Sequence, residues 1–330
     1  MIVGPLKNNI QLSVILLLVI CTGLWIGTLT LSSSVYVPDA AYDEHILYYY
    51  FFSNKLSYTI TQIIAFIVIM LGAFFVNFMS VQQEITSKNN FLPSFFYILF
   101  AFSATAKNSL EPILVSNLFV LAALYFLINS YRREDALSDF FNAGLCMGVA
   151  SFFYIDYLLI FPILYIALLI LRAFNWREWL VSLLGLVLPL FIYMCLCYLS
   201  NGDIFSFYNL LKDAIHQLQL PVISEFYIGF LMVTILLFIF ALIHYFGKGF
   251  GGKVKTQKTK YIMLWLLGLC LLMAFFEQLP DMVLLSSIIP LSILLGDYIA
   301  EIKQLKIANT LLVLFMGAFI VVYFYALGII

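Results

Sequence analysis

The chain has 330 residues, of which 64% are apolar and 10% are charged, and its formal net charge is −1. A soluble domain is closer to half apolar and a quarter charged because its surface must be polar, so this composition excludes an ordinary soluble globular protein. We therefore expect an integral membrane protein with a single membrane domain over residues 1–330. Its main partner is then the lipid bilayer, and no nucleic-acid partner is expected.

Apolar blocks follow one another along the whole chain, and most are long enough to cross a hydrocarbon core of ~30 Å, which takes ~20 helical residues. The predicted helices cover residues 10–30, 57–80, 91–106, 111–130, 138–154, 157–172, 179–199, 226–246, 261–276, 282–298 and 307–328. The first block favours a retained span over a cleaved signal peptide, whose apolar stretch is shorter. The pattern predicts an all-α polytopic transmembrane helix bundle of about eleven spans.

Three of these hairpins are less clearly defined than the other spans. They cover residues 91–130, 138–172 and 261–298, each ~35–40 residues long, which is too long for one span and just enough for two. Each has a polar break near its middle, at Glu111-Pro112, at Asp156 and at Pro280-Asp281. Proline suits a helix start or a turn, so we expect the chain to reverse at these points.

The basic residues predict an orientation. With the N-terminus in the cytoplasm, the inner loops hold Lys7, Lys88, Arg132, Arg133, Arg172, Arg177, Lys248, Lys253, Lys255, Lys258, Lys260, Lys303 and Lys306. The outer loops hold only Lys55, Lys107 and Lys212. This agrees with the positive-inside rule at every inner loop, and one missed helix would spoil it. The C-terminus is then extracytoplasmic, and the Gly- and Lys-rich inner loop 247–260 is expected to be a flexible cationic linker.

The first long outer loop, residues 31–56, carries candidate catalytic acids. If the chain is helical from Pro38, then Asp39 and Asp43 lie one turn apart on one face. Two carboxylates so placed could hold a divalent cation or supply a general base, and Glu44 beside them could contact substrate. The alternative is an amphipathic connector whose acids are solvated and favour a helix start.

The second long outer loop, residues 200–225, contains an amphipathic stretch. Its Lys212 and His216 are four residues apart and could face a phosphate together. The alternative is an interfacial helix that lies flat with its apolar residues in lipid. Within the spans, the polar residues are expected to be interhelical hydrogen-bonding groups; they are Gln62, Asn77, Asn117 and Asn142.

Short segments carry a resemblance to a known family. They are Leu92-Pro93, Phe141-Asn142-Ala143-Gly144 and Arg172-Ala173-Phe174-Asn175-Trp176-Arg177-Glu178-Trp179, the last followed by Gly185 and Pro189. Together they resemble an uncharacterised family of polytopic inner-membrane proteins from Gram-negative bacteria. The resemblance covers most of the chain, implies the bacterial inner membrane as its location, and brings no established activity. The residues of the third segment by themselves indicate arginines at headgroups and tryptophans at the interface.

The order of elements is also similar, more distantly, to that of GT-C glycosyltransferases. Those proteins begin inside, cross once and carry a catalytic acid in the first outer loop, which here contains Pro38-Asp39-Ala40-Ala41-Tyr42-Asp43-Glu44. The resemblance implies transfer of a sugar from a polyprenyl-phosphate-linked donor at the outer leaflet. Asp39 or Asp43 would be the base or metal ligand, and Lys212 and His216 would contact phosphate. The first outer loop is shorter here, and no soluble outer domain follows.

Two other functions stay open on the sequence. A structural or assembly subunit that contacts other envelope proteins fits the lack of a strong catalytic signature. A transporter could use the broken hairpins for a site at the bilayer midplane, but the hydropathy pattern shows no internal repeat.

Overall fold

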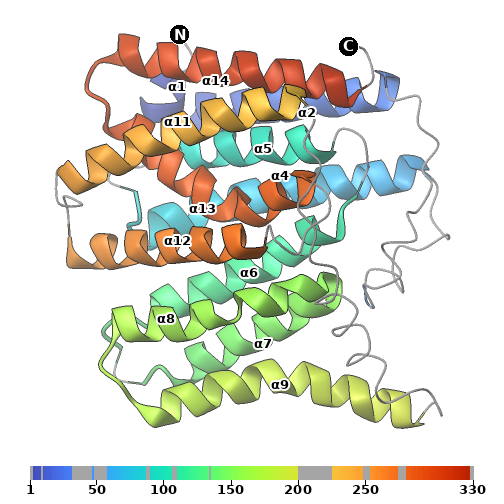
Figure 1. Ribbon diagram of the computed structural model, residues 1–330, viewed down its shortest axis with the longest axis vertical. Coiled ribbons are helices and arrows are strands. Elements are labelled where there is room, and N and C mark those ends of the chain that lie inside the picture. Colours follow the sequence, from blue (N-terminus) through green and yellow to red (C-terminus); the bar gives the residue numbers. More distant parts are fainter. Residues whose placement is uncertain are drawn as a thin grey trace.

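The computed structural model describes residues 3–8, 10–31, 47, 58–86, 90–105, 110–133, 135–199, 225–247, 253–273 and 280–327. Within these ranges the chain forms helices and no strand (Figure 1). The elements are α1 (Val3–Asn8), α2 (Ile10–Leu31), α4 (Tyr58–Gln82), α5 (Leu92–Thr105), α6 (Pro112–Asn129), α7 (Leu137–Phe153), η2 (Ile155–Ile160), α8 (Pro162–Leu171), α9 (Trp176–Leu199), α11 (Glu225–Gly247), α12 (Val254–Met273), α13 (Pro280–Glu301) and α14 (Leu305–Ala326). Every predicted segment therefore contains a helix.

Within the described residues, seven helices are long and apolar enough to cross a membrane: α2, α4, α6, α9, α11, α13 and α14. The helices α5 and α7, and the pair formed by η2 and α8, are apolar but shorter. The prediction of an all-α membrane bundle is confirmed at this level, whereas the number of about eleven spans stays a prediction.

The expected breaks within the first two hairpins are confirmed. Glu111 is extended, with φ −101° and ψ 138°, and Pro112 follows it at the start of α6. This is the conformation that a residue before proline prefers, because the helical region is sterically disfavoured there. Tyr154 is also extended and ends α7, and the 3₁₀ helix η2 follows it. In the third hairpin α13 begins at Pro280, and residues 274–279 lie outside the described part.

The centre of the bundle is α5, in which every residue is buried. Its 14 residues span about 21 Å, less than a hydrocarbon core, and a short helix is tolerated there because protein surrounds it. It packs mainly against α13, where Gly296 lies against Pro93. A Cβ on Gly296 would lie 2.6 Å from the Pro93 nitrogen, so the close approach of these helices requires glycine.

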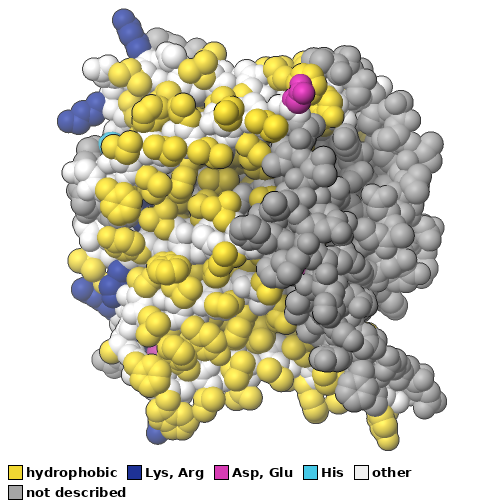
Figure 2. All heavy atoms as spheres, viewed as in Figure 1, with side chains coloured by type: hydrophobic (Ala, Val, Ile, Leu, Met, Phe, Trp, Pro, Cys, Tyr) yellow, Lys and Arg dark blue, Asp and Glu magenta, His cyan; other side chains and the backbone are white. Residues whose placement is uncertain are grey.

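The outermost helices expose apolar surface. On α2, α9, α11 and α14, many large hydrophobic side chains are more than a third exposed. Figure 2 shows apolar side chains in bands across one face of the described part, with Lys and Arg side chains along its left edge. A soluble protein rarely exposes so large an apolar surface, and a hydrocarbon environment accounts for it.

The start of α12 corrects one prediction. Residues 247–260 were expected to be a flexible linker, but α12 begins at Val254, so Lys255, Lys258 and Lys260 are helical. Lysine is a good helix former. These side chains also bind neighbouring elements, because Lys255 donates to Gln83 Oε1 at 2.8 Å and Lys258 to the Leu171 carbonyl at 3.1 Å.

Candidate functional site

The candidate residues from the two outer loops all lie outside the described residues: Asp39, Asp43, Glu44, Lys212 and His216. The helices that flank those loops are described. In Figure 1, α2 ends and α4 begins on the right, and α9 ends and α11 begins on the same side. We call this side of the bundle the distal end. Both predicted loops thus connect helices at one end, so the topology allows their residues to share a site.

Polar contacts near the distal end join α6, η2 and α13. The Tyr157 hydroxyl donates to Asn117 Oδ1 at 2.5 Å, and Asn117 Nδ2 donates to the Leu285 carbonyl at 3.0 Å. All three residues are buried. Asn117 therefore has the interhelical bonding role that the sequence predicted. Glu111, six residues earlier at the start of α6, is also buried.

A groove lies between α7 and α9. It has a volume of about 290 Å³. Its lining residues are Leu47, Leu145, Val149, Phe152, Leu188, Pro189, Ile192, Tyr193 and Leu196. None of these side chains is charged, and Leu47 is the single described residue of the stretch 32–57. The groove therefore suits an apolar chain rather than a polar headgroup.

Glycines set the shape of the wall beside this groove. A Cβ on Gly144 of α7 would lie 2.1 Å from the Ser182 carbonyl oxygen, and a Cβ on Gly185 of α9 would lie 2.2 Å from the Phe141 carbonyl oxygen. A Cβ on Gly148 would lie 2.7 Å from the Leu186 carbonyl oxygen. The two helices thus touch backbone to backbone, as small residues allow in membrane bundles.

A buried cluster of ionisable side chains lies at the other end of the bundle, which we call the basic end. Lys260 Nζ lies 2.5 Å from Asp297 Oδ2 and 3.5 Å from Glu301 Oε1. Lys260 and Asp297 are each 1% exposed. The Glu301 carboxylate also lies 2.7 Å from His244 Nε2, and the Tyr245 hydroxyl donates to Asp297 at 3.2 Å. The cluster joins α11, α12 and α13.

This cluster was not predicted from the sequence. Lys260 was expected in a loop, and Asp297 was not among the candidate residues, although that acid falls inside the predicted span 282–298. An acid in an apolar span is costly, and its four-residue spacing to Glu301 places both on one helix face. That pattern could have pointed to a buried cation partner.

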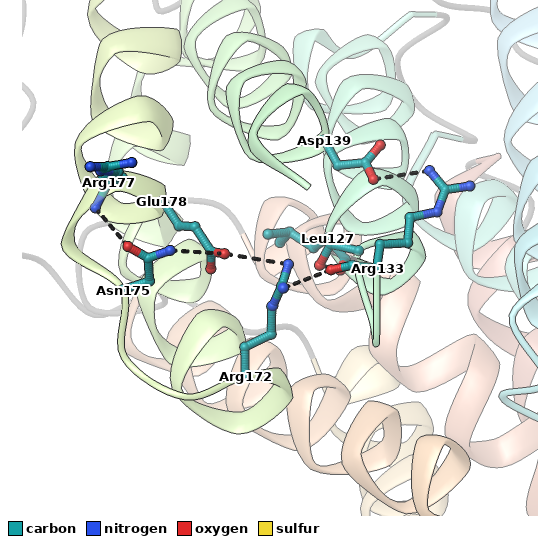
Figure 3. Close-up of polar contacts among 8 residues, drawn as sticks. Leu127, Arg133, Asp139, Arg172, Asn175, Arg177 and Glu178 are labelled. Atoms are coloured by element: carbon teal, nitrogen blue, oxygen red, sulfur yellow. Dashed lines mark hydrogen bonds and ion pairs between the residues drawn. The ribbon is translucent and has the colours of Figure 1, made fainter. Parts of the chain in front are cut away.

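The segment singled out for its arginines and tryptophans forms a second network at the basic end (Figure 3). Arg172 donates to the Arg133 carbonyl at 2.7 Å and pairs with Glu178 at 3.4 Å, while Arg133 pairs with Asp139 at 3.2 Å. The Asn175 side-chain oxygen accepts a hydrogen bond from the Arg177 backbone at 3.2 Å, which caps α9. Arg172 therefore bonds within the protein, whereas Trp176 and Arg177 are exposed as the interfacial interpretation expects.

Contacts between basic segments place them at one end of the bundle. Lys253 at the start of α12 pairs with Glu84 after α4 at 2.8 Å, and Lys7 donates to the Ile302 carbonyl at 3.1 Å. The hydrogen bond from Lys253 and its charge hold the pKa of Glu84 below the ordinary value of 4.5. The loops that the charge count assigned to one side thus lie together.

The described residues contain no group of three or more His, Cys, Asp or Glu side chains that could hold a metal ion. The predicted metal ligands Asp39 and Asp43 are not among the residues searched. In the cluster at the basic end, the carboxylates of Asp297 and Glu301 on α13 pair with Lys260 on α12.

Comparisons with known proteins identify the family of this chain and a solved structure with a similar fold. Residues 40–330 match a family of unknown function, DUF6427. No curated protein matches the sequence. Among solved structures, the crystal structure of ArnT from Cupriavidus metallidurans bound to undecaprenyl phosphate is similar, with a TM-score of 0.60 and 13% sequence identity. The match covers 92% of this chain, and this chain spans 63% of that one. ArnT is a GT-C glycosyltransferase, so the distant GT-C likeness is confirmed for the fold.

Proposed function

The chain belongs to the DUF6427 family of unknown function, and we propose that it is a GT-C-like transferase of the bacterial inner membrane. It uses a polyprenyl-phosphate-linked sugar donor at the outer leaflet. The observation that carries the proposal is the fold shared with ArnT over 92% of this chain. A fold by itself does not fix an activity, so the chemistry must come from the site.

The proposed orientation places the distal end on the extracytoplasmic side of the inner membrane. The basic segments that contact one another, such as Lys253 with Glu84 and Arg172 with Arg133, lie at one end of the bundle. Positively charged segments are retained in the cytoplasm, so this end faces inward and about eleven crossings place the C-terminus outside. The loops 31–56 and 200–225 then face the leaflet where the donor is used.

The chemistry of the proposed reaction assigns roles to the loop residues. Asp39 or Asp43 takes the proton from an acceptor hydroxyl as that oxygen forms a bond to the anomeric carbon of the sugar. The bond between that carbon and the phosphate oxygen breaks, and polyprenyl phosphate leaves. Lys212 and His216 stabilise the charge of the leaving phosphate, and Glu44 contacts the substrate. The two aspartates could instead hold a divalent cation at the phosphate.

The test is binding and transfer by the purified protein. Native mass spectrometry in detergent should detect a complex with undecaprenyl phosphate, and reconstituted protein should consume undecaprenyl-phosphate-linked sugars supplied as a panel. Failure both to bind the lipid and to consume any donor in the panel would contradict the proposal. Recovery of the protein in a stable complex with other envelope proteins, together with that failure, would favour an assembly subunit.

A further inference from the structure

The groove between α7 and α9 is concave, and its described lining holds no charged or amide side chain. Another pocket, beside α4, is larger at about 460 Å³, but its lining includes Asn77, Gln82 and Asn90. The α7–α9 groove runs from Leu145 and Val149 on α7 to Ile192 and Leu196 on α9, beside the glycine contact. Ile192 and Leu196 are 50% and 59% exposed, so the groove is open to the surrounding lipid. A chain molecule can therefore enter it from the bilayer.

The chemistry of the lining favours an apolar tail whose polar end is bound elsewhere. The described lining carries no charged side chain, so it offers nothing to a phospholipid headgroup. Phe152, Tyr193 and Pro189 instead give flat, rigid surfaces, which pack well against a methyl-branched chain.

The covalent chain connects this groove to the predicted catalytic loop. Leu47 lines the groove and lies three residues after Glu44 and four after Asp43. An extended chain spans at most about 3.6 Å per residue, which keeps the Cα atom of Glu44 within about 11 Å of that of Leu47. A lipid whose tail lies in the groove can thus present its phosphate to the loop that carries the acids.

We propose that the α7–α9 groove binds the isoprenoid tail of the polyprenyl-phosphate-linked donor. The assignment rests on the proposed function and adds the site at which the lipid part of the substrate is recognised. The wall formed by Phe152, Ile192 and Tyr193 contacts the part of the tail nearest the phosphate, because these residues follow the glycine contact toward the distal end.

The first test fills the groove from one wall. Ile192→Trp places an indole in the groove, whereas Leu184→Trp places the same side chain on α9 at a position that is 61% exposed and outside the groove. Both variants and the wild type are titrated with undecaprenyl phosphate by native mass spectrometry. Because a few buried methylene groups account for a tenfold change in affinity, Ile192→Trp should weaken binding by about tenfold or more. Leu184→Trp should bind as the wild type does.

The second test needs no substitution in the groove. A photoreactive polyprenyl phosphate with a diazirine on its first isoprene units is crosslinked to the wild-type protein, and the modified peptides are mapped. Crosslinks should concentrate on residues 145–152 and 188–196. An excess of phosphatidylglycerol should leave them unchanged.

The outcomes separate this inference from the proposed function. Wild-type binding and transfer that are unaffected by Ile192→Trp would overturn the groove assignment and leave the transferase in place. Crosslinks spread evenly over α2, α9, α11 and α14, or lost to phosphatidylglycerol, would also overturn it, since the groove would then be a general lipid surface. A wild type that binds no polyprenyl phosphate would remove both.

Discussion

Lys260 on α12 and Asp297 on α13 form an ion pair with an N–O distance of 2.5 Å, in which both side chains are 1% exposed. Lys260 Nζ also lies 4.5 Å from the centre of the Tyr245 ring on α11. A buried charge is tolerated only where it is paired and bonded, so the three helices depend on one another at this point.

The first prediction concerns this pair. Lys260→Met leaves Asp297 and Glu301 without their shared cation, so it should lower the free energy of unfolding by about 3–5 kcal/mol. Replacing both partners, as Lys260→Met with Asp297→Leu, should recover much of the loss because fewer charges stay buried. Unfolding in detergent micelles measures the difference.

A matched control lies at the start of the same helix. Lys253 pairs with Glu84, but its side chain is 73% exposed. Lys253→Met should leave the free energy of unfolding nearly unchanged, because solvent screens an exposed ion pair. Equal losses of stability in Lys260→Met and Lys253→Met would show that the buried ion pair contributes no more to folding than the exposed one.

The second prediction concerns the backbone contact between α7 and α9. Gly185→Ala places a methyl group 2.2 Å from the Phe141 carbonyl oxygen, so α9 must shift, and overpacking of this kind costs about 1–3 kcal/mol. Gly268→Ala on α12 is the control, because nothing lies within 4 Å of its added Cβ. It should be neutral or stabilising by up to about 1 kcal/mol, since alanine favours helices over glycine. Thermal melts of both variants measure these changes in stability. A melting temperature of Gly185→Ala equal to that of the wild type would mean that α9 packs less closely against α7 than described.

The third prediction is a pH dependence at Glu84. Because Lys253 lowers the pKa of Glu84 in the folded protein, the stability from this pair is fully present above the ordinary value of 4.5. It is lost as the pH falls through the lowered pKa. The melting temperature of Glu84→Gln should therefore lie below that of the wild type at neutral pH, and the gap should close in acid. A gap that widens in acid would contradict the assignment.

The fourth prediction concerns orientation. A reporter enzyme that is active only outside the cytoplasm should be active when fused at Asp39 and inactive when fused at Lys255. The expectation follows from the basic segments that contact one another at one end of the bundle. Activity at both fusions would place both positions in one compartment and would remove the proposed topology.

Much of the fold could be predicted from the sequence because apolar runs and prolines are local signals. The breaks at Glu111-Pro112 and Asp156 were visible as polar interruptions, and the structure begins α6 at Pro112 and ends α7 at Phe153, shortly before Asp156. The basic segments also lie together, as expected for loops on one side of the membrane. The charge pattern predicts the side on which a loop lies and does not predict which side chains contact one another.

The parts that could not be predicted depend on distant pairing. The helical start of α12 follows from its contacts with Gln83, Leu171 and Asp297, which lie far away in the sequence. For the same reason, no local pattern predicts that Arg172 bonds to the Arg133 carbonyl rather than to headgroups. The roles of Asp39 and Lys212 stay predictions, because both lie outside the described residues.

The most direct test of the account is sugar transfer by acid variants. Asp39→Asn and Asp43→Asn are compared with the wild type in proteoliposomes, at equal protein level, with an undecaprenyl-phosphate-linked sugar that the wild type consumes. Removing a general base typically lowers the rate by about 10²–10⁴-fold, so at least one variant should lose transfer to that extent while still binding the lipid. Wild-type transfer rates in both variants would contradict catalysis by the first outer loop.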